Sequence, residues 1–203
     1  MLGGAQHFSK HIDNLALLCS PFRNILKKDA KFLWTEAHEK AFGDLKEAIA
    51  RIARNNFFNK HLKTRIRCDA SHNGLGASLE QLHGSDWKPV AFASRFLNDN
   101  ELKYSTNELE LLGVVWLCEH FKHYLFGSEF VVQTDHRALL SVLKDNRANR
   151  TYQSRLTRWV DRLLPFNFTI EHIAGSKMGF VDLMSRSPKS EAPQFLTPIQ
   201  TIL

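Results

Sequence analysis

The sequence is poor in the residues that define several protein classes. Its 203 residues include only 3 Cys, 10 Gly and 6 Pro. The cysteines Cys19, Cys68 and Cys118 are odd in number and form no Cys-x-x-Cys pair, so they support neither a disulfide framework nor a zinc ribbon. The small share of glycine and proline excludes collagen-like and low-complexity chains. We therefore expect a globular protein from a reducing compartment.

Long apolar stretches are also missing. The longest uninterrupted apolar run, 111–118, is far shorter than the roughly 20 residues that span a bilayer. The N-terminus lacks the charged and then apolar plan of a secretory signal. We therefore expect an intracellular, cytoplasmic protein without a membrane segment. The formal net charge of +6 and the pI near 9.3 weakly favour a polyanionic partner such as nucleic acid.

The first sixty residues show helical periodicity. Apolar residues recur at helical spacing between Phe8 and Leu26. A second helix is predicted after Thr35, the expected N-cap, with Glu36 and Glu39 in the first turn, where negative charge suits the helix dipole.

From Thr64 onward the pattern changes to strands and helices in alternation. The spacing predicts an antiparallel meander of strands over 64–70, 77–82 and 89–93, with a turn at Gly74-x-Gly76. Further elements are predicted as a helix over 107–125, a strand over 130–134, helices over 137–143 and 151–164, a strand over 166–173 and a short helix near Asp182. This order implies an α/β protein with a mixed sheet covered by helices. Residues 188–203 are expected to be a linker tail.

Four acids stand where acids are unexpected. Asp69 lies in an apolar strand, Glu110 in the first turns of a helix, Asp135 at a strand end, and Asp182 at the start of the last helix. If the first and fourth strands are adjacent and parallel, Asp69 and Asp135 lie side by side, and the N-terminal half of a helix packed above brings Glu110 onto them. The oxygen ligands of such a cluster suit Mg²⁺ or Mn²⁺. The alternative is that each acid is separately solvated or salt-bridged.

The motifs around these acids resemble one family. They are Cys68-Asp69-Ala70-Ser71 with Gly74-x-Gly76-Ala77, Tyr104-Ser105-x-x-Glu108-Leu109-Glu110-Leu111-Leu112, Thr134-Asp135-His136-x-x-Leu139, and Ala174-Gly175-Ser176-Lys177 followed by Val181-Asp182-x-x-Ser185-Arg186. In this order they are similar to the ribonuclease H domain of gypsy-like long-terminal-repeat retrotransposon polyproteins. Upstream, the segment Phe32-x-Trp34-Thr35 and the residues after it look like the thumb and tether of the same reverse transcriptases.

The resemblance implies a ribonuclease H-like mixed five-stranded sheet with flanking helices over 61–187, preceded by a small helical thumb or tether segment over 1–60. It also implies endonucleolytic cleavage of the RNA strand of RNA/DNA hybrids with two Mg²⁺ ions, for which Mn²⁺ can substitute. The ligand quartet carries over onto Asp69, Glu110, Asp135 and Asp182. Glu108 competes with Glu110, which fits better because Leu111 follows it and continues the apolar helix face.

Further candidates are assigned by analogy or by helical spacing. His172 matches the place of a histidine that assists proton transfer or product release in related enzymes, and a strand histidine without a role is the equal alternative. Ser71 and Asn73 are candidates for contacts with RNA 2′-hydroxyls. Arg155, Arg158 and Arg162 share one helix face and form a candidate ridge for duplex phosphates, against which stands an ordinary solvated arginine face.

Two other functions compete with hydrolysis. One is a catalytically idle module that binds a hybrid or docks onto the rest of a reverse transcriptase and integrase polyprotein. The other is DNA polymerisation, but the sequence contains no Asp-Asp doublet, so we expect no polymerase active site in this chain. The family also implies a continuing polyprotein and a location within virus-like particles.

Overall fold

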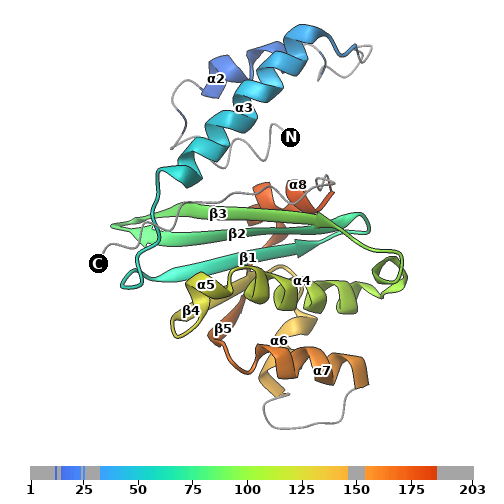
Figure 1. Ribbon diagram of the computed structural model, residues 1–203. Helices are drawn as coiled ribbons and strands as arrows, with labels where there is room; N and C mark the ends of the chain where they lie inside the picture. The colour runs from blue at the N-terminus through green and yellow to red at the C-terminus, as the bar shows by residue number, and fades with distance from the viewer. Residues whose placement is uncertain (1–11, 13–14, 24, 26–32, 146–153, 187–203) are drawn as a thin grey trace.

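The computed structural model describes residues 12, 15–23, 25, 33–145 and 154–186, and it is built around a five-stranded sheet (Figure 1). The strand order is β3-β2-β1-β4-β5. The meander β1 (Thr64–Ala70), β2 (Gly74–His83) and β3 (Asp86–Phe96) is antiparallel. The strands β4 (Glu129–Thr134) and β5 (Asn167–His172) join β1 in parallel. The predicted mixed sheet with flanking helices is therefore confirmed.

Two strands are longer than the sequence predicts. β2 and β3 extend to a two-residue hairpin turn, in which Gly84 adopts a positive φ of 62°. The predicted turn at Gly74-x-Gly76 is wrong, because both glycines are part of β2. The chain instead reverses at residues 71–73, where the Ser71 amide donates to the Gly74 carbonyl at 2.9 Å.

One face of the sheet is covered by α4 (Thr106–His120), with α6 (Ala138–Asp145) and α7 (Ser154–Leu163) packed beyond it (Figure 1). The predicted helix over 107–125 is divided at Phe121, after which α5 (Lys122–Leu125) follows. The main core lies between α4 and the sheet, where its buried apolar side chains include Ile66, Leu75, Val114, Leu117 and Val132. Apolar residues on almost every side of α4 are buried, as expected for a helix inside a domain.

The opposite face of the sheet carries α8 (Phe180–Arg186), which follows the 3-10 turn η3 (Gly175–Lys177). Near α8, the long helix α3 (Glu36–Arg54) packs against β3, with α2 (Leu15–Leu18) and η1 (Ser20–Arg23) beside it. A second, smaller core lies here, with the buried residues Ile12, Leu15, Leu45, Ala48, Ile49 and Ile52. Phe92 on β3 and Phe180 on α8 pack against it, and their ring centroids are 4.9 Å apart. A further 3-10 turn, η2 (Glu101–Lys103), precedes α4.

The N-terminal helices agree in part with the prediction. Thr35 is the N-cap of α3, and Glu36 and Glu39 lie in its first turn. Within the first predicted helix, from Phe8 to Leu26, the described residues form two short elements, α2 and η1, while residues 8–11, 13–14, 24 and 26 and all of the linker tail lie outside the described residues. The division at residue 60, between α3 and β1, stays a prediction. Among the described residues, every helix is too short or too polar to cross a bilayer.

Candidate active site

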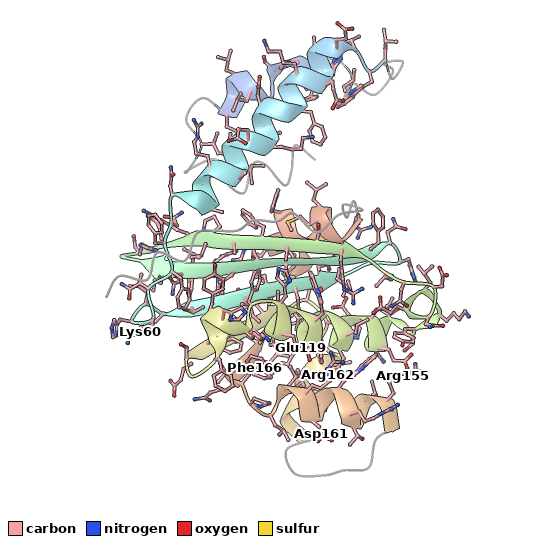
Figure 2. All side chains as sticks on the ribbon, in the orientation of Figure 1. Lys60, Glu119, Arg155, Asp161, Arg162 and Phe166 are labelled. Carbon is pink, nitrogen blue, oxygen red and sulfur yellow. The ribbon has the colours of Figure 1, made fainter. Side chains whose placement is uncertain are left out.

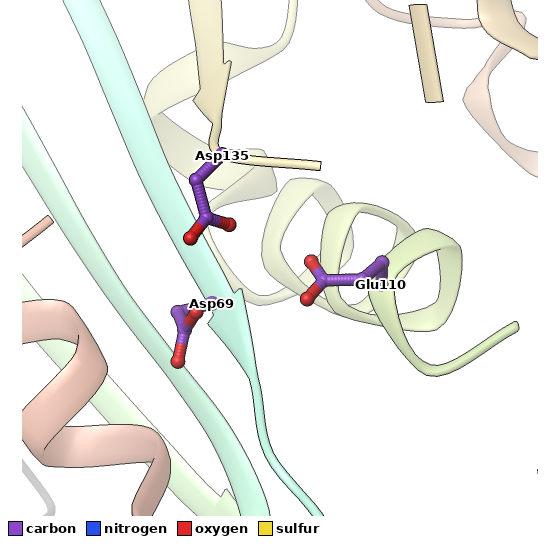
Figure 3. A group of neighbouring side chains, drawn as sticks. All are labelled: Asp69, Glu110 and Asp135. Carbon is purple, nitrogen blue, oxygen red and sulfur yellow. The ribbon is translucent and has the colours of Figure 1, made fainter. Parts of the chain in front are cut away.

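Three carboxylates from separate elements meet at one edge of the sheet. Asp69 comes from β1, Glu110 from α4, and Asp135 from the residue after β4 (Figure 3). One oxygen of each lies within 4.8 Å of the others. Asp69 is 7% exposed and Glu110 is 5% exposed, so two of the three are buried.

The pairing of the strands explains this meeting. β1 and β4 run parallel with Arg67 opposite Gln133, and continuing this register by two residues sets Asp69 beside Asp135. Carboxyl ends of adjacent parallel strands share one edge of a sheet. α4 follows its N-cap Ser105, whose side chain forms a capping box with that of Glu108, and Glu110 is buried in the first turns of the helix.

Burial and neighbouring carboxylates raise the pKa values of Asp69 and Glu110. Burial raises the pKa of Asp69 to about 6, and Asp135 and Asp182 add to this, whereas a hydrogen bond from Ser185 opposes it. Burial, followed by the charges of Asp69 and Asp135, raises the pKa of Glu110 to about 8. Like charges held together at such short distances are unfavourable unless a proton or a cation neutralises them.

Glu110 shows that the cluster fits a cation. Its Oε2 atom is buried and has no hydrogen-bond partner. A buried acceptor without a partner is costly, and native structures rarely keep one without a reason. Three carboxylates with a free, inward-facing oxygen form the oxygen-rich set that Mg²⁺ and Mn²⁺ prefer. The donor set therefore fits a divalent cation.

Asp182, the fourth predicted ligand, lies outside this cluster. It is the third residue of α8 rather than its first, because the apolar pair before it is already helical. Its carboxylate is paired with Arg186 at 2.8 Å, and its side chain is 40% exposed. It still acts on the cluster through its charge, which contributes to the raised pKa of Asp69.

The comparisons with known proteins agree with this geometry. The sequence profile described as the RNase H-like domain found in reverse transcriptase matches residues 59–166. The chain belongs to this family. The matched segment holds β1 to α7, and with them Asp69, Glu110 and Asp135.

The relatives of this RNase H-like domain are transposon polyproteins. The retrovirus-related Pol polyprotein from transposon 297 of Drosophila melanogaster is 37% identical over 91% of this chain, and the transposon Tf2-3 polyprotein of Schizosaccharomyces pombe is 31% identical over 91%. The chain spans only 17% and 14% of these proteins. The gypsy-like resemblance is consistent with them.

Solved structures show the same fold. Native prototype foamy virus protease-reverse transcriptase aligns over 85% of this chain and 23% of its own, with a TM-score of 0.67 and 18% identity. A foamy viral protease-reverse transcriptase in complex with dsDNA aligns over 84% of this chain and 37% of its own, with a TM-score of 0.62 and 19% identity. These likenesses confirm the predicted ribonuclease H-like fold.

Glu108, the alternative to Glu110, has another environment in the RNase H-like domain. Its carboxylate accepts a hydrogen bond from the Ser105 amide at 2.8 Å and forms an ion pair with Arg155 at 2.8 Å. The hydrogen bonds from Ser105 and the charge of Arg155 lower the pKa of Glu108. The structure thus places Glu110 in the cluster and Glu108 at the helix start.

Two histidines lie beside Asp135. Nε2 of His172 is 3.1 Å from the Asp135 carbonyl oxygen. Because a carbonyl only accepts, this nitrogen is the donor. Nε2 of His136 lies 2.5 Å from Oδ1 of Asn107 on α4. The backbone amide of His136 donates to Oγ1 of Thr134 at 3.1 Å.

Two of the three arginines of the predicted ridge contact α4. Arg155 pairs with Glu108 and stacks over the Tyr104 ring at 4.4 Å, and Arg162 pairs with Glu119 at 2.5 Å (Figure 2). These arginines therefore link α7 to α4. Their contact with a duplex, like that of Arg158, stays a prediction.

Ser71 and Asn73, the other predicted nucleic-acid contacts, bind α8. Ser71 Oγ donates to the Ser185 carbonyl at 2.7 Å, and Asn73 Nδ2 donates to the Arg186 carbonyl at 3.3 Å. The carbonyls at a helix C-terminus have no partner within the helix, so these two side chains satisfy them. An RNA contact would involve groups already bonded within the domain.

Sequence reasoning missed the roles of two residues next to the carboxylates. Ser185 is fully buried and its hydroxyl bonds to Asp69 Oδ2. A Cβ on Gly175 would lie 2.9 Å from Asp135 Oδ2, so glycine leaves room for that carboxylate. Both residues stand in the motifs that carry the family resemblance, but spacing alone assigns them no contact.

Proposed function

We propose that this chain is a divalent-metal-dependent ribonuclease H that cleaves the RNA strand of RNA/DNA hybrids during retrotransposon reverse transcription. The observation that carries the proposal is the cluster of Asp69, Glu110 and Asp135, with a buried and unpartnered Glu110 oxygen, in a domain of the reverse transcriptase RNase H-like family.

The three clustered carboxylates would hold the cation, and Asp182 would approach it from α8. Divalent metal bound there, Mg²⁺ or Mn²⁺, supplies an activated water and stabilises charge on the phosphate and leaving oxygen. Asp69 and Glu110 bind as carboxylates, so Glu110, with its pKa of about 8, must lose its proton when the cation binds. Cleavage should therefore rise with pH between about 6 and 8.

His172 would move a proton at the edge of this site. The hydrogen bond from its Nε2 to the Asp135 carbonyl holds the ring beside the cluster. This role is supported by the position of His172 beside the cluster. We propose an RNA/DNA hybrid and the rest of a reverse transcriptase polyprotein as partners, in the cytoplasm or within virus-like particles. The transposon polyprotein relatives and the net charge of +6 support these partners.

The test is cleavage of an end-labelled RNA/DNA hybrid by the full chain with Mg²⁺ or Mn²⁺. Asp69→Asn is the inactive control, because it keeps the size of the side chain and removes its charge. We expect the wild type to cut only the RNA strand of the hybrid, to leave single-stranded RNA intact, and to lose activity in the variant. Binding of the hybrid without cleavage by either protein would favour the idle binding module instead.

A further inference from the structure

The proposed function gives Asp69 a central place, and the structure shows what holds this side chain. We propose that Ser185 is a positioning residue for Asp69, which it fixes through a hydrogen bond made when α8 docks onto the sheet at Gly76. The inference rests on the proposed function and adds a residue that acts through Asp69 rather than on the substrate.

The contact itself is buried. Ser185 is 0% exposed, and its hydroxyl donates a hydrogen bond to Asp69 Oδ2. The same hydroxyl lies 2.9 Å from the Asp182 carbonyl oxygen. A hydroxyl has one proton to donate, and an ionised carboxylate is the stronger of these acceptors. A carboxylate has about four lone-pair sites, so Asp69 can accept this bond and still coordinate a cation.

Gly76 makes the contact possible. It is paired with Asp69 across the β1–β2 ladder, under the middle of α8. A Cβ at this position would lie 2.5 Å from the Val181 carbonyl oxygen and 2.6 Å from the Ser185 amide nitrogen, distances that backbone atoms do not tolerate. Only glycine lets the helix backbone come this close to the strand.

The turn after β1 secures the other end of α8. Ser71 and Asn73 donate to the carbonyls of Ser185 and Arg186, which fixes the last turn of the helix to the strand that carries Asp69. The hydroxyl of Ser185 therefore meets Asp69 in one geometry. Asp182 lies on the same short helix, so the contact also sets its distance from the cluster.

The experiment compares two buried serines in the full chain. Ser185→Ala removes the hydroxyl bonded to Asp69. The control, Ser78→Ala, removes an equally buried hydroxyl that donates to the Glu80 carboxylate at 2.9 Å, away from the cluster. Ser185→Cys keeps the size of the side chain with a weaker donor, and it covers the case in which the alanine variant does not fold.

The readout is the binding of Mn²⁺ alone, measured by isothermal titration calorimetry. Circular dichroism confirms that each variant is folded. Loss of a group that orients a metal ligand typically weakens binding 10–100-fold. We expect Ser185→Ala to raise the Kd for Mn²⁺ by about tenfold, Ser185→Cys by less, and Ser78→Ala by less than about twofold. The Mg²⁺ concentration for half-maximal cleavage should shift in the same order.

Failure of the Ser185 role and failure of the proposed function give different results. Unchanged Mn²⁺ affinity in folded Ser185→Ala and Ser185→Cys, or an equal shift in Ser78→Ala, would overturn the role of Ser185 and leave the proposed function standing. A wild-type chain that neither binds Mn²⁺ nor cuts the hybrid would overturn the proposed function itself.

Discussion

Two buried glutamates of this domain have opposite electrostatic surroundings. Glu80 on β2 is 4% exposed and Glu110 on α4 is 5% exposed. Glu80 pairs with Arg65 at 2.6 Å and with Arg67 at 3.6 Å, and it accepts a hydrogen bond from Ser78. Glu110 has two acids as neighbours and an oxygen without a partner.

Their pKa values differ in direction for this reason. Burial alone would raise the pKa of Glu80, but Arg67 and Arg65 outweigh it and the pKa is lowered. At Glu110 the neighbouring charges add to the effect of burial, and its pKa rises to about 8. Glu80 is thus buried beside two arginines and Glu110 beside two acids, and strongly perturbed pKa values of the second kind are common at functional sites.

The largest expected effect is the loss of hybrid cleavage when Glu110, but not Glu80, is replaced. Glu110→Gln should reduce cleavage of the hybrid by more than about a hundredfold. This exceeds the roughly 10–100-fold loss that is typical when a residue hydrogen-bonded to a metal ligand is replaced. The free energy of unfolding should not fall, because a neutral amide is not repelled by the neighbouring carboxylates and needs no cation to neutralise it. Single-turnover cleavage and urea unfolding of the same preparation measure both quantities. A destabilised but active variant would contradict this interpretation of Glu110.

The next effect concerns stability. Glu80→Gln should lower the free energy of unfolding by about 3–5 kcal/mol, since it removes the negative charge that pairs with the half-buried Arg65 and the buried Arg67. Cleavage per folded molecule should stay close to that of the wild type. Urea titration checks the stability, and a variant as stable as the wild type would show that the pair is not structural.

The pH dependence of stability should have opposite signs at the two sites. The folded pKa of Glu110 is raised from 4.5 to about 8, so its contribution to stability is lost as pH rises across this window. Without metal, the wild type should lose at least about 2 kcal/mol more than Glu110→Gln between pH 5 and pH 8. Stability from Glu80 is instead present above pH 4.5 and is lost as pH falls through its lowered pKa. Parallel curves for the wild type and Glu110→Gln in chelator-treated buffers would refute the raised pKa of Glu110.

The smallest effect tests the helix that closes the site next to Asp69. Gly76→Ala should cost about 1–3 kcal/mol of unfolding free energy, because its Cβ meets the backbone of α8. The matched control is Gly113→Ala in α4, whose Cβ would meet only Leu75 Cδ2 at 3.9 Å and should be neutral or stabilising. Thermal melts of the two variants compare them, and equal melting temperatures would show that the close approach at Gly76 does not matter for stability.

Much of this fold follows from local pattern. The alternation of polar and apolar residues in β1 and the capping signal of α3 predict their elements closely, because these depend on neighbours in sequence. The break at Phe121 and the extension of β2 and β3 depend on tertiary packing and are not visible in the pattern.

The candidate site shows the same division. The choice of Glu110 over Glu108 follows from the helix face, and the structure places Glu110 in the cluster. The pairing of Arg155 with Glu108, the bond from Ser185 to Asp69 and the Asp182–Arg186 pair join residues by geometry that spacing does not contain. A glycine inside a strand, as at Gly76, is the one sequence signal that points to the close approach of another backbone.

The most direct test of a cation site in this domain is the anomalous diffraction of crystals of the full chain grown with Mn²⁺. We expect a peak between Asp69, Glu110 and Asp135, with Oε2 of Glu110 among the ligands. A cluster without a peak, in which that oxygen is protonated or bonded to a protein group, would contradict the proposed cation site.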